Sequence, residues 1–264
     1  MVQPQLMGDA RGTLARLFSA GAGALAGLVD LVLPADCAAC GEPAAGRDLC
    51  LGCADLLAGP PRPARPSPAP GGLPPCFAAG DYAGPMRELI LAYKERGRRN
   101  LAAPLGDALA RVVLATWPVR ARRAPAVALV PVPGTAAAIR DRHGDHMLRL
   151  ARRAALTLRN EGCPAEVVTA LRALPKDDSA HLNRDQRALA ARHAFAVRPG
   201  RVQPLRQMAD DAAVVLLDDV LTTGSTLAAV AGRLLEAGVP VAFGVTLAAT
   251  QLRGARNYMG HGAS

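Results

Sequence analysis

The most informative hydrophobic pattern lies near the C-terminal end of the chain, where an apolar run precedes two adjacent acidic residues. Residues 214–217 read Val-Val-Leu-Leu, and Asp218 and Asp219 follow directly. A loop of hydroxyl and glycine residues comes next, and residues 227–237 then have apolar positions at helical spacing. A continuous apolar run before a loop and a helix is typical of a buried parallel strand. We therefore predict an α/β unit whose strand ends at the two acids.

The same two kinds of pattern predict further elements on both sides of this unit. Strand patterns cover residues 77–82, 127–133, 166–169, 194–197 and 241–249, and helix patterns cover residues 86–93, 101–116 and 147–158. The polar residues 176–183 predict a loop, and residues 185–192 predict a helical or extended arm. Strands that alternate with helices favour a parallel sheet flanked by helices.

The N-terminal part of the chain lacks this alternation. Residues 14–33 are apolar but rich in glycine and alanine and contain Asp30, so they predict a packed helix rather than a signal peptide or a membrane span. Residues 58–75 hold many prolines without periodicity and predict a semi-rigid spacer. The predicted order is an N-terminal helix (1–33), a cysteine module (34–57), the spacer (58–75), the main domain (76–250) and a tail (251–264).

Four of the six cysteines form two C-x-x-C pairs, Cys37 with Cys40 and Cys50 with Cys53. Two such pairs can present four thiolates to one tetrahedral Zn²⁺, and a module this small would gain most of its folding energy from the metal. Free reduced thiols and a redox pair are the alternatives. Metal ligation suits a reducing compartment, so we expect a cytoplasmic protein. The isolated Cys76 and Cys163 are interpreted as buried thiols.

The charge of the chain is compatible with a polyanionic ligand. The 264 residues include 31 basic and 22 acidic side chains, and the net charge is +9. Aromatic residues make up only 3% of the chain, which disfavours binding of single-stranded DNA by base stacking. A polyphosphate substrate fits the positive charge equally well.

The loop after the two acids has the chemistry of a phosphate site. Its members are Thr222, Thr223, Gly224, Ser225 and Thr226. Backbone N–H groups at a helix start attract anions, glycine lets the backbone approach closely, and the hydroxyls add donors. The two acids can hold sugar hydroxyls or Mg²⁺. The alternative is a buried strand, an acidic turn and an N-capped helix without a ligand.

Taken in order, these parts resemble the ComF family, the ComFC/GntX-like proteins of bacterial DNA uptake and carbon-source utilisation. The resemblance covers about Leu31 to Ala249. It includes the Leu-Val-Leu-Pro sequence before the first cysteine pair, both pairs, Tyr82-Ala-Gly-Pro, Tyr93-Lys94, Val130-Pro-Val-Pro and residues 214–226. The last string resembles the signature with which type I phosphoribosyltransferases bind phosphoribosyl pyrophosphate (PRPP).

The resemblance implies a type I phosphoribosyltransferase-like sheet preceded by a small zinc-ribbon-like module. PRPP and Mg²⁺ would bind at the carboxyl edge of the sheet, with the 5′-phosphate in the loop of residues 222–226. Asp218 and Asp219 would hold the ribose hydroxyls. Pyrophosphate would lie near Pro133, Gly134 and Arg142. An unidentified nitrogen acceptor would then displace it.

Two departures from the family pattern change these expectations. Only Cys76 stands where many members carry a second set of cysteines, so one structural zinc is expected. The sequence Arg-His-Gly-Asp at 142–145 replaces the usual Arg-Gly-Phe-Asn. His143 and His146 are interpreted as polar surface or substrate-contact residues rather than metal ligands.

A second hypothesis is a non-catalytic PRPP-fold scaffold that contacts DNA-uptake proteins or single-stranded DNA. The basic residues 94–99 are compatible with such contacts, with phosphate binding, or with a solvated loop. A third hypothesis is redox sensing by the cysteines.

Overall fold

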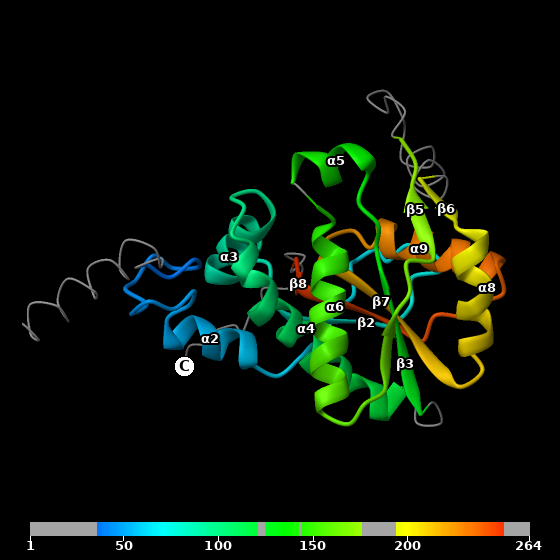
Figure 1. The fold of residues 1–264 in the computed structure, drawn as a ribbon, viewed down its shortest axis with the longest axis horizontal. Helices are drawn as coiled ribbons and strands as arrows, with labels where there is room; N and C mark the ends of the chain where they lie inside the picture. The colour runs from blue at the N-terminus through cyan, green and yellow to red at the C-terminus, as the bar shows by residue number, and fades with distance from the viewer. Residues whose placement is uncertain (1–35, 121–124, 143, 176–193, 251–264) are drawn as a thin grey trace, which may run out of the picture.

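The computed structural model describes residues 36–120, 125–142, 144–175 and 194–250. Its centre is a six-stranded sheet in the order β1-β2-β8-β7-β3-β4 (Figure 1). The strands are β1 (Arg62–Pro63), β2 (Cys76–Asp81), β3 (Ala126–Pro131), β4 (Ala165–Val167), β7 (Ala212–Leu221) and β8 (Phe243–Ala249). All neighbours pair in parallel except β1, which is antiparallel to β2. The prediction of an α/β fold with a mostly parallel sheet is confirmed.

Helices cover both faces of this sheet (Figure 1). They are α2 (Leu51–Ala58), α3 (Gly84–Lys94), α4 (Ala102–Arg120), α5 (Ala136–Asp141), α6 (His146–Asn160), α8 (Pro199–Met208) and α9 (Ser225–Glu236), with a 3-10 helix η1 (Arg99–Leu101) before α4. Buried residues of α2, α3, α4 and α6 form one apolar core with the sheet. Buried residues of α8 and α9 form the core on the other face, where the short antiparallel strands β5 (Leu171–Ala173) and β6 (Phe195–Val197) also pack.

The long strand β7 runs through the middle of the sheet, between β3 and β8. Residues 212–217 are all buried because helices cover both faces, which explains why the sequence shows an unbroken apolar run there. The strand continues through both acids to Leu221, four residues beyond the run that predicted it. The two acids therefore belong to the strand and share its fixed geometry.

Most of the predicted elements agree with the structure to within a few residues. The helices predicted at 86–93, 101–116, 147–158 and 227–237 correspond to α3, α4, α6 and α9. Helices α2, α5 and α8 and strand β5 have no counterpart in the prediction. The predicted N-terminal helix, the tail and the loop and arm at 176–192 lie outside the described residues. No helix in the described part of the chain is long and apolar enough to cross a membrane.

The proline-rich segment differs from the predicted spacer. Arg62 and Pro63 form strand β1 at the edge of the main sheet, and the Ala64 N–H donates to the Cys76 carbonyl at 2.8 Å. The cysteine module also packs on the main domain, because Cys53 and Leu57 of α2 belong to the same apolar core as α3 and α4. The predicted boundaries at 57 and 75 therefore do not separate independent cores.

Helices α4 and α6 are in close contact at Gly106. A Cβ atom at this position would lie 2.6 Å from the Cβ and Cγ atoms of Arg153. The contact is reinforced because Arg153 donates two hydrogen bonds to the Asp107 carboxylate, at 2.7 and 2.9 Å. The small residue and the ion pair together set the distance between the two helices.

We expect Gly106→Ala to lower the free energy of unfolding by about 1–3 kcal/mol, because an overpacked helix contact must shift its backbone. Gly232→Ala in α9 is the matched control, since no atom lies within 4 Å of its Cβ position. That control should be neutral or stabilising by up to about 1 kcal/mol. Urea unfolding measures both values, and equal effects would contradict the proposed close contact.

Candidate functional site

The carboxyl ends of β7, β3, β8 and β2 bring several polar groups to one edge of the sheet. Asp218 of β7 lies beside Thr246 of β8, and the N–H of Val132 after β3 donates to the Leu217 carbonyl at 2.8 Å. The N–H of Thr250 after β8 donates to the Leu221 carbonyl at 2.9 Å. This edge is where open α/β sheets bind ligands.

Asp219 is the centre of a buried charged cluster. Its Oδ2 atom lies 2.6 Å from Nζ of Lys94 and 3.1 Å from Nε2 of His146. Lys94 is the last residue of α3 and His146 is the first residue of α6. Tyr93 joins these two helix ends, because its hydroxyl donates to the His146 carbonyl at 2.9 Å. Three elements therefore converge on one carboxylate that is only 8% exposed.

The surroundings of Asp219 favour its ionised form. Burial alone would raise the pKa of this carboxyl group, but the hydrogen bond from His146 and the charge and hydrogen bond of Lys94 lower it to about 2. The negative charge of Asp219 is thus held by the chain itself. A ligand that uses Asp219 must share it with Lys94 or displace the ammonium group.

Asp218 has a different environment, although it is the next residue along the strand. Its Oδ1 atom accepts a hydrogen bond from the Asp219 N–H at 2.9 Å. The pKa of Asp218 is raised because burial and the nearby charge of Asp219 both disfavour its ionised form. A divalent cation or a pair of ligand hydroxyls beside it would offset both effects. Asp218 is therefore the carboxylate that remains available to a ligand.

The loop after β7 exposes the donors that the sequence predicts. Gly224 adopts a left-handed conformation with φ of +77° and directly precedes helix α9. Thr222, Thr223 and Thr226 are exposed, and the Thr223 hydroxyl lies 3.0 Å from that of Ser225. Gly224 has no side-chain oxygen to cap α9, and the Ser225 N–H at the start of this helix makes only a long hydrogen bond of 3.4 Å to the Thr223 hydroxyl. The first N–H groups of α9 lack intrahelical partners and can therefore turn to an external acceptor.

A basic cavity of about 810 Å³ lies next to Asp219, between α3, α5 and α6. Its cationic lining residues outnumber its carboxylates; the cations are Lys94, Arg96, Arg99, Arg142 and Arg149, and the carboxylates are Glu95 and Asp141. Arg142 donates to Glu95 at 3.0 Å across this cavity. Such a surplus of guanidinium groups suits a phosphate-bearing ligand.

The residues expected to receive pyrophosphate lie at the same edge but do not form one cluster. Arg142 lines the basic cavity at the end of α5. Pro133 and Gly134 follow β3 and are half-buried, and the neighbouring Thr135 caps α5 and lines the cavity. The cavity thus reaches from the end of β3 to Lys94. His143 lies outside the described residues.

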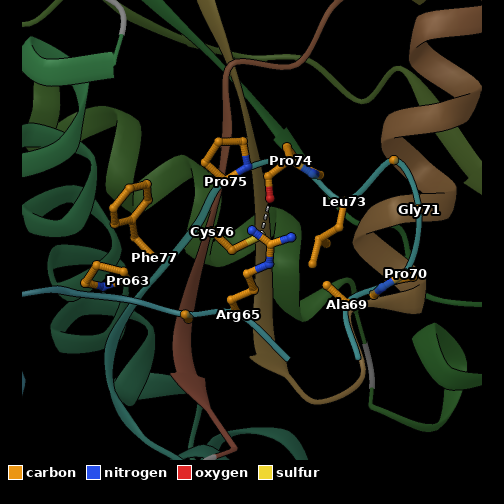
Figure 2. Close-up of a pocket in the computed structure, with 12 residues that line it drawn as sticks. Pro63, Arg65, Ala69, Pro70, Gly71, Leu73, Pro74, Pro75, Cys76 and Phe77 are labelled. Carbon is orange, nitrogen blue, oxygen red and sulfur yellow. Dashed lines mark hydrogen bonds between the residues drawn. The ribbon is translucent and has the colours of Figure 1, made fainter. Parts of the chain in front are cut away.

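The proline-rich segment borders the phosphate-like loop from the other side. A Cβ atom on Gly224 would lie 3.0 Å from Leu73 and 3.2 Å from Pro66. A cavity of about 430 Å³ extends from Arg62 and Arg65 to Thr222. A larger one, about 600 Å³, is formed within residues 63–77, where the Cys76 thiol donates to the Pro74 carbonyl at 3.2 Å (Figure 2). The lining of this cavity includes Arg65 but no carboxylate.

The four paired cysteines form a second candidate site at the N-terminal side of the domain. The Sγ atoms of Cys37, Cys40, Cys50 and Cys53 all lie within 4.8 Å of one another. The Sγ atoms of Cys40 and Cys50 are 3.6 Å apart, close to the roughly 3.8 Å that tetrahedral zinc–thiolate bonds impose. The cluster can hold one metal ion, and its chemistry is compatible with zinc.

The protonation of this cluster explains why a cation would stabilise it. Burial would raise the pKa of Cys37, but hydrogen bonds from the backbone of Cys40, Cys50 and Ala39 lower it to about 6. The pKa of Cys53 is raised by burial and by its cysteine neighbours. Each thiolate disfavours ionisation of the next thiol, because the two negative charges repel each other. The positive charge of a metal ion is therefore needed to keep all four cysteines ionised at this distance. Cys50 and Cys53 gain further support from the start of helix α2.

Sequence reasoning missed two members of the Asp219 cluster. His146 was expected to be a surface or substrate-contact residue but is 8% exposed and bonded to Asp219, so its placement on the surface was wrong. Lys94 was noticed within the basic stretch 94–99 and in the Tyr93-Lys94 part of the resemblance, in neither case as a partner of Asp219. A single lysine at a helix end gives no signal of its long-range partner. Cys76 and Cys163 are buried free thiols, as predicted.

Comparison with models of known protein families gave no match, and comparison with curated proteins found no similar sequence.

We expect the purified protein to bind one zinc ion per chain, and Cys40→Ala to abolish that binding and lower the melting temperature. Cys40 is exposed, so its substitution removes a ligand without opening a cavity in the core. Cys163→Ala is the control, because this thiol lies outside the cluster. Elemental analysis and thermal unfolding measure both effects. Zinc retained by Cys40→Ala would contradict the four-cysteine site.

We expect Lys94→Met to lower the free energy of unfolding by about 3 kcal/mol at pH 7, because it leaves a buried carboxylate without its counter-charge. The pKa of Asp219 is about 2 in the folded protein and ~3.9 in an unfolded chain. The stabilisation that ionised Asp219 contributes is therefore complete above pH ~3.9 and is lost as the pH falls toward 2.

Urea unfolding of wild type and Lys94→Met at pH 7 and pH 3 tests this relation. The difference between the two proteins should shrink at pH 3, where Asp219 begins to be protonated. The double variant Lys94→Met/Asp219→Asn should recover part of the loss at pH 7. A difference that is equal at both pH values would exclude Asp219 as the partner that matters.

Proposed function

We propose that the protein binds PRPP with Mg²⁺ at the carboxyl edge of its sheet and transfers the phosphoribosyl group to a nitrogen acceptor. The observation that carries this proposal is the end of β7. Two acids in different electrostatic environments are followed by a left-handed glycine and an uncapped helix start. A ribose 5-phosphate has the matching sequence of groups, a diol at one end and a phosphate at the other.

The 5′-phosphate would lie in the loop of residues 222–226. The open N–H groups at the start of α9 and the exposed threonine hydroxyls supply donors for its oxygens. Arg62 and Arg65, which line the cavity that reaches Thr222, add positive charge nearby. Asp218 would then take the ribose hydroxyls, since its carboxylate is not engaged by Lys94.

The pyrophosphate would extend into the basic cavity. Lys94 forms the boundary between this cavity and Asp219, so one ammonium group can contact both the carboxylate and the leaving group. Arg142 and Arg149 provide further donors from α5 and α6. Mg²⁺ bound with PRPP would neutralise part of the pyrophosphate charge.

The reaction itself requires little from the protein except position and charge. A bond forms from the acceptor nitrogen to C1, while the bond from C1 to the pyrophosphate oxygen breaks. The electron pair leaves with pyrophosphate, and the nitrogen gives its proton to water. Placement of the reactants and cationic stabilisation of the leaving group lower the barrier. The cations of the basic cavity are suited to stabilising the pyrophosphate leaving group.

The type I phosphoribosyltransferase fold and membership of the ComF family are part of this proposal. The mostly parallel sheet, the four-cysteine cluster before it and the motif at 214–226 support them. A link to DNA uptake follows only from the family resemblance.

Calorimetry with PRPP and Mg²⁺ tests the proposed function. We expect wild type to bind, and Asp218→Asn to weaken binding at least about tenfold, because a charge-assisted contact is lost. Asp211→Asn is the matched control, since it removes the same charge at the exposed amino end of β7. Failure of wild type to bind would refute the proposal. If binding is found, release of pyrophosphate on adding amines and nucleobases identifies the acceptor.

A further inference from the structure

A carboxylate of the cysteine module, that of Asp48, contacts the segment that forms one wall of the basic cavity. Asp48 lies two residues before Cys50, and its Oδ1 atom accepts a hydrogen bond from the Asn100 side-chain amide. The same atom lies 3.6 Å from a guanidinium nitrogen of Arg98. Arg98 lies between Gly97 and Arg99, which both line the cavity, and Asn100 follows directly. Asp48 thus connects two sites that are far apart in the sequence.

The position of Asp48 depends on both cysteine pairs. Its carbonyl accepts a hydrogen bond from the N–H of Ala38, which lies between Cys37 and Cys40. The chain from Asp48 continues directly into Cys50, which precedes helix α2. A metal that holds the four thiolates together fixes the first pair relative to α2. The backbone of Asp48 is then held by the hydrogen bond from Ala38 and by the chain that leads into Cys50.

Arg98 makes the attachment electrostatically important. Its side chain is half-buried, and its Nε and Nη2 atoms have no hydrogen-bond partner among the described residues. The Asp48 carboxylate supplies the counter-charge, since its Oδ1 atom lies 3.6 Å from Nη2. Loss of Asp48 would leave a largely desolvated guanidinium group without compensation. The segment 98–100 would have to move to expose that charge to water.

Movement of this segment would change the cavity. Lys94, Arg96 and Arg99 all line it, and they are separated from Arg98 by at most a few residues. Backbone hydrogen bonds hold the segment as one compact turn, with the Arg98 N–H donating to the Ala92 carbonyl at 3.1 Å. A shift at Arg98 is therefore passed on to the cations on either side.

We propose that Asp48 is a positioning residue through which metal at the four-cysteine site holds residues 94–100 in the arrangement that binds phosphate groups. The cysteine module then serves as a support for the cavity, and loss of its metal weakens anion binding there. This inference rests on the proposed function only in identifying the natural anion as the pyrophosphate of PRPP.

Helix α2 itself has anchors that do not involve the metal. Leu57 is 2% exposed in the shared core, and its carbonyl accepts a hydrogen bond from Arg111 at 2.8 Å. Between the first cysteine pair and Cys50, only the small Ala44 and the adjacent Leu49 are buried, and an isolated bridge from Asp36 to Pro43 and a few turn hydrogen bonds complete the contacts. We expect removal of metal to loosen the chain around Asp48 while α2 stays packed.

The test uses inorganic pyrophosphate with Mg²⁺ as the probe and calorimetry on the full chain. We compare zinc-loaded wild type, zinc-stripped wild type, Asp48→Ala and Asp55→Ala. Asp55 is an exposed acid in α2, so its substitution removes the same charge from the same module. We expect zinc removal and Asp48→Ala each to weaken pyrophosphate binding about tenfold, and Asp55→Ala to bind as wild type does.

Hydrogen exchange gives a second readout, because it reports movement of the backbone and would not respond to the lost charge of Asp48 alone. Amides of residues 94–100 should exchange faster in Asp48→Ala and in zinc-stripped protein, whereas amides of α2 around Leu57 should stay protected. Asp48→Ala should retain its zinc, which separates the attachment from metal binding. This variant also keeps the test decisive if zinc-stripped protein unfolds.

The outcomes distinguish this inference from the proposed function. Pyrophosphate binding that is unchanged in Asp48→Ala overturns the inference, as does absence of pyrophosphate binding in zinc-loaded wild type. If wild type binds pyrophosphate in an Asp48-dependent way but does not bind PRPP, the inference stands and the proposed function fails.

Discussion

A buried carboxylate at the end of the central strand determines how this protein is built around its site. Asp219 is 8% exposed, and a charge in that position is tolerated only with partners that offset its desolvation. Lys94 and His146 are those partners, and they come from the end of α3 and the start of α6. The requirement for counter-charge therefore fixes where two helices meet the sheet. The basic cavity lies between those same helix ends.

The proline-rich segment and the cysteine module also lie close to the site. The proline-rich segment forms the edge strand β1 and packs Leu73 and Pro66 against Gly224 of the phosphate-like loop. The cysteine module reaches the opposite wall through Asp48 and Asn100. The proline-rich segment thus borders the phosphate-like loop, and the cysteine module borders the wall of the basic cavity. Their attachment explains why the chain has no independent spacer between two modules.

The sequence predicted the local features of this protein better than its long-range ones. The run at 214–217 indicated a strand, and the glycine-hydroxyl loop indicated a turn and a helix start, because each has a periodicity or a residue type of its own. The two acids were placed at the end of that strand but lie within it. The pairing of Lys94 and His146 with Asp219 has no such signal, since it depends on how α3 and α6 end in space. Strand β1 gives no such signal either. Its two residues pair with β2 through backbone groups, and the many prolines around them do not predict a strand.

The proposed function requires one ligand to lie across the end of β7, with its phosphate in the loop of residues 222–226 and its pyrophosphate beside Lys94 and Arg142. A crystal structure of the zinc-loaded protein with PRPP and Mg²⁺ tests this most directly. We expect density for the 5′-phosphate at the start of α9, for the ribose hydroxyls at Asp218, and for the pyrophosphate in the basic cavity. A ligand bound in the reverse orientation, or at a site remote from β7, would contradict the account.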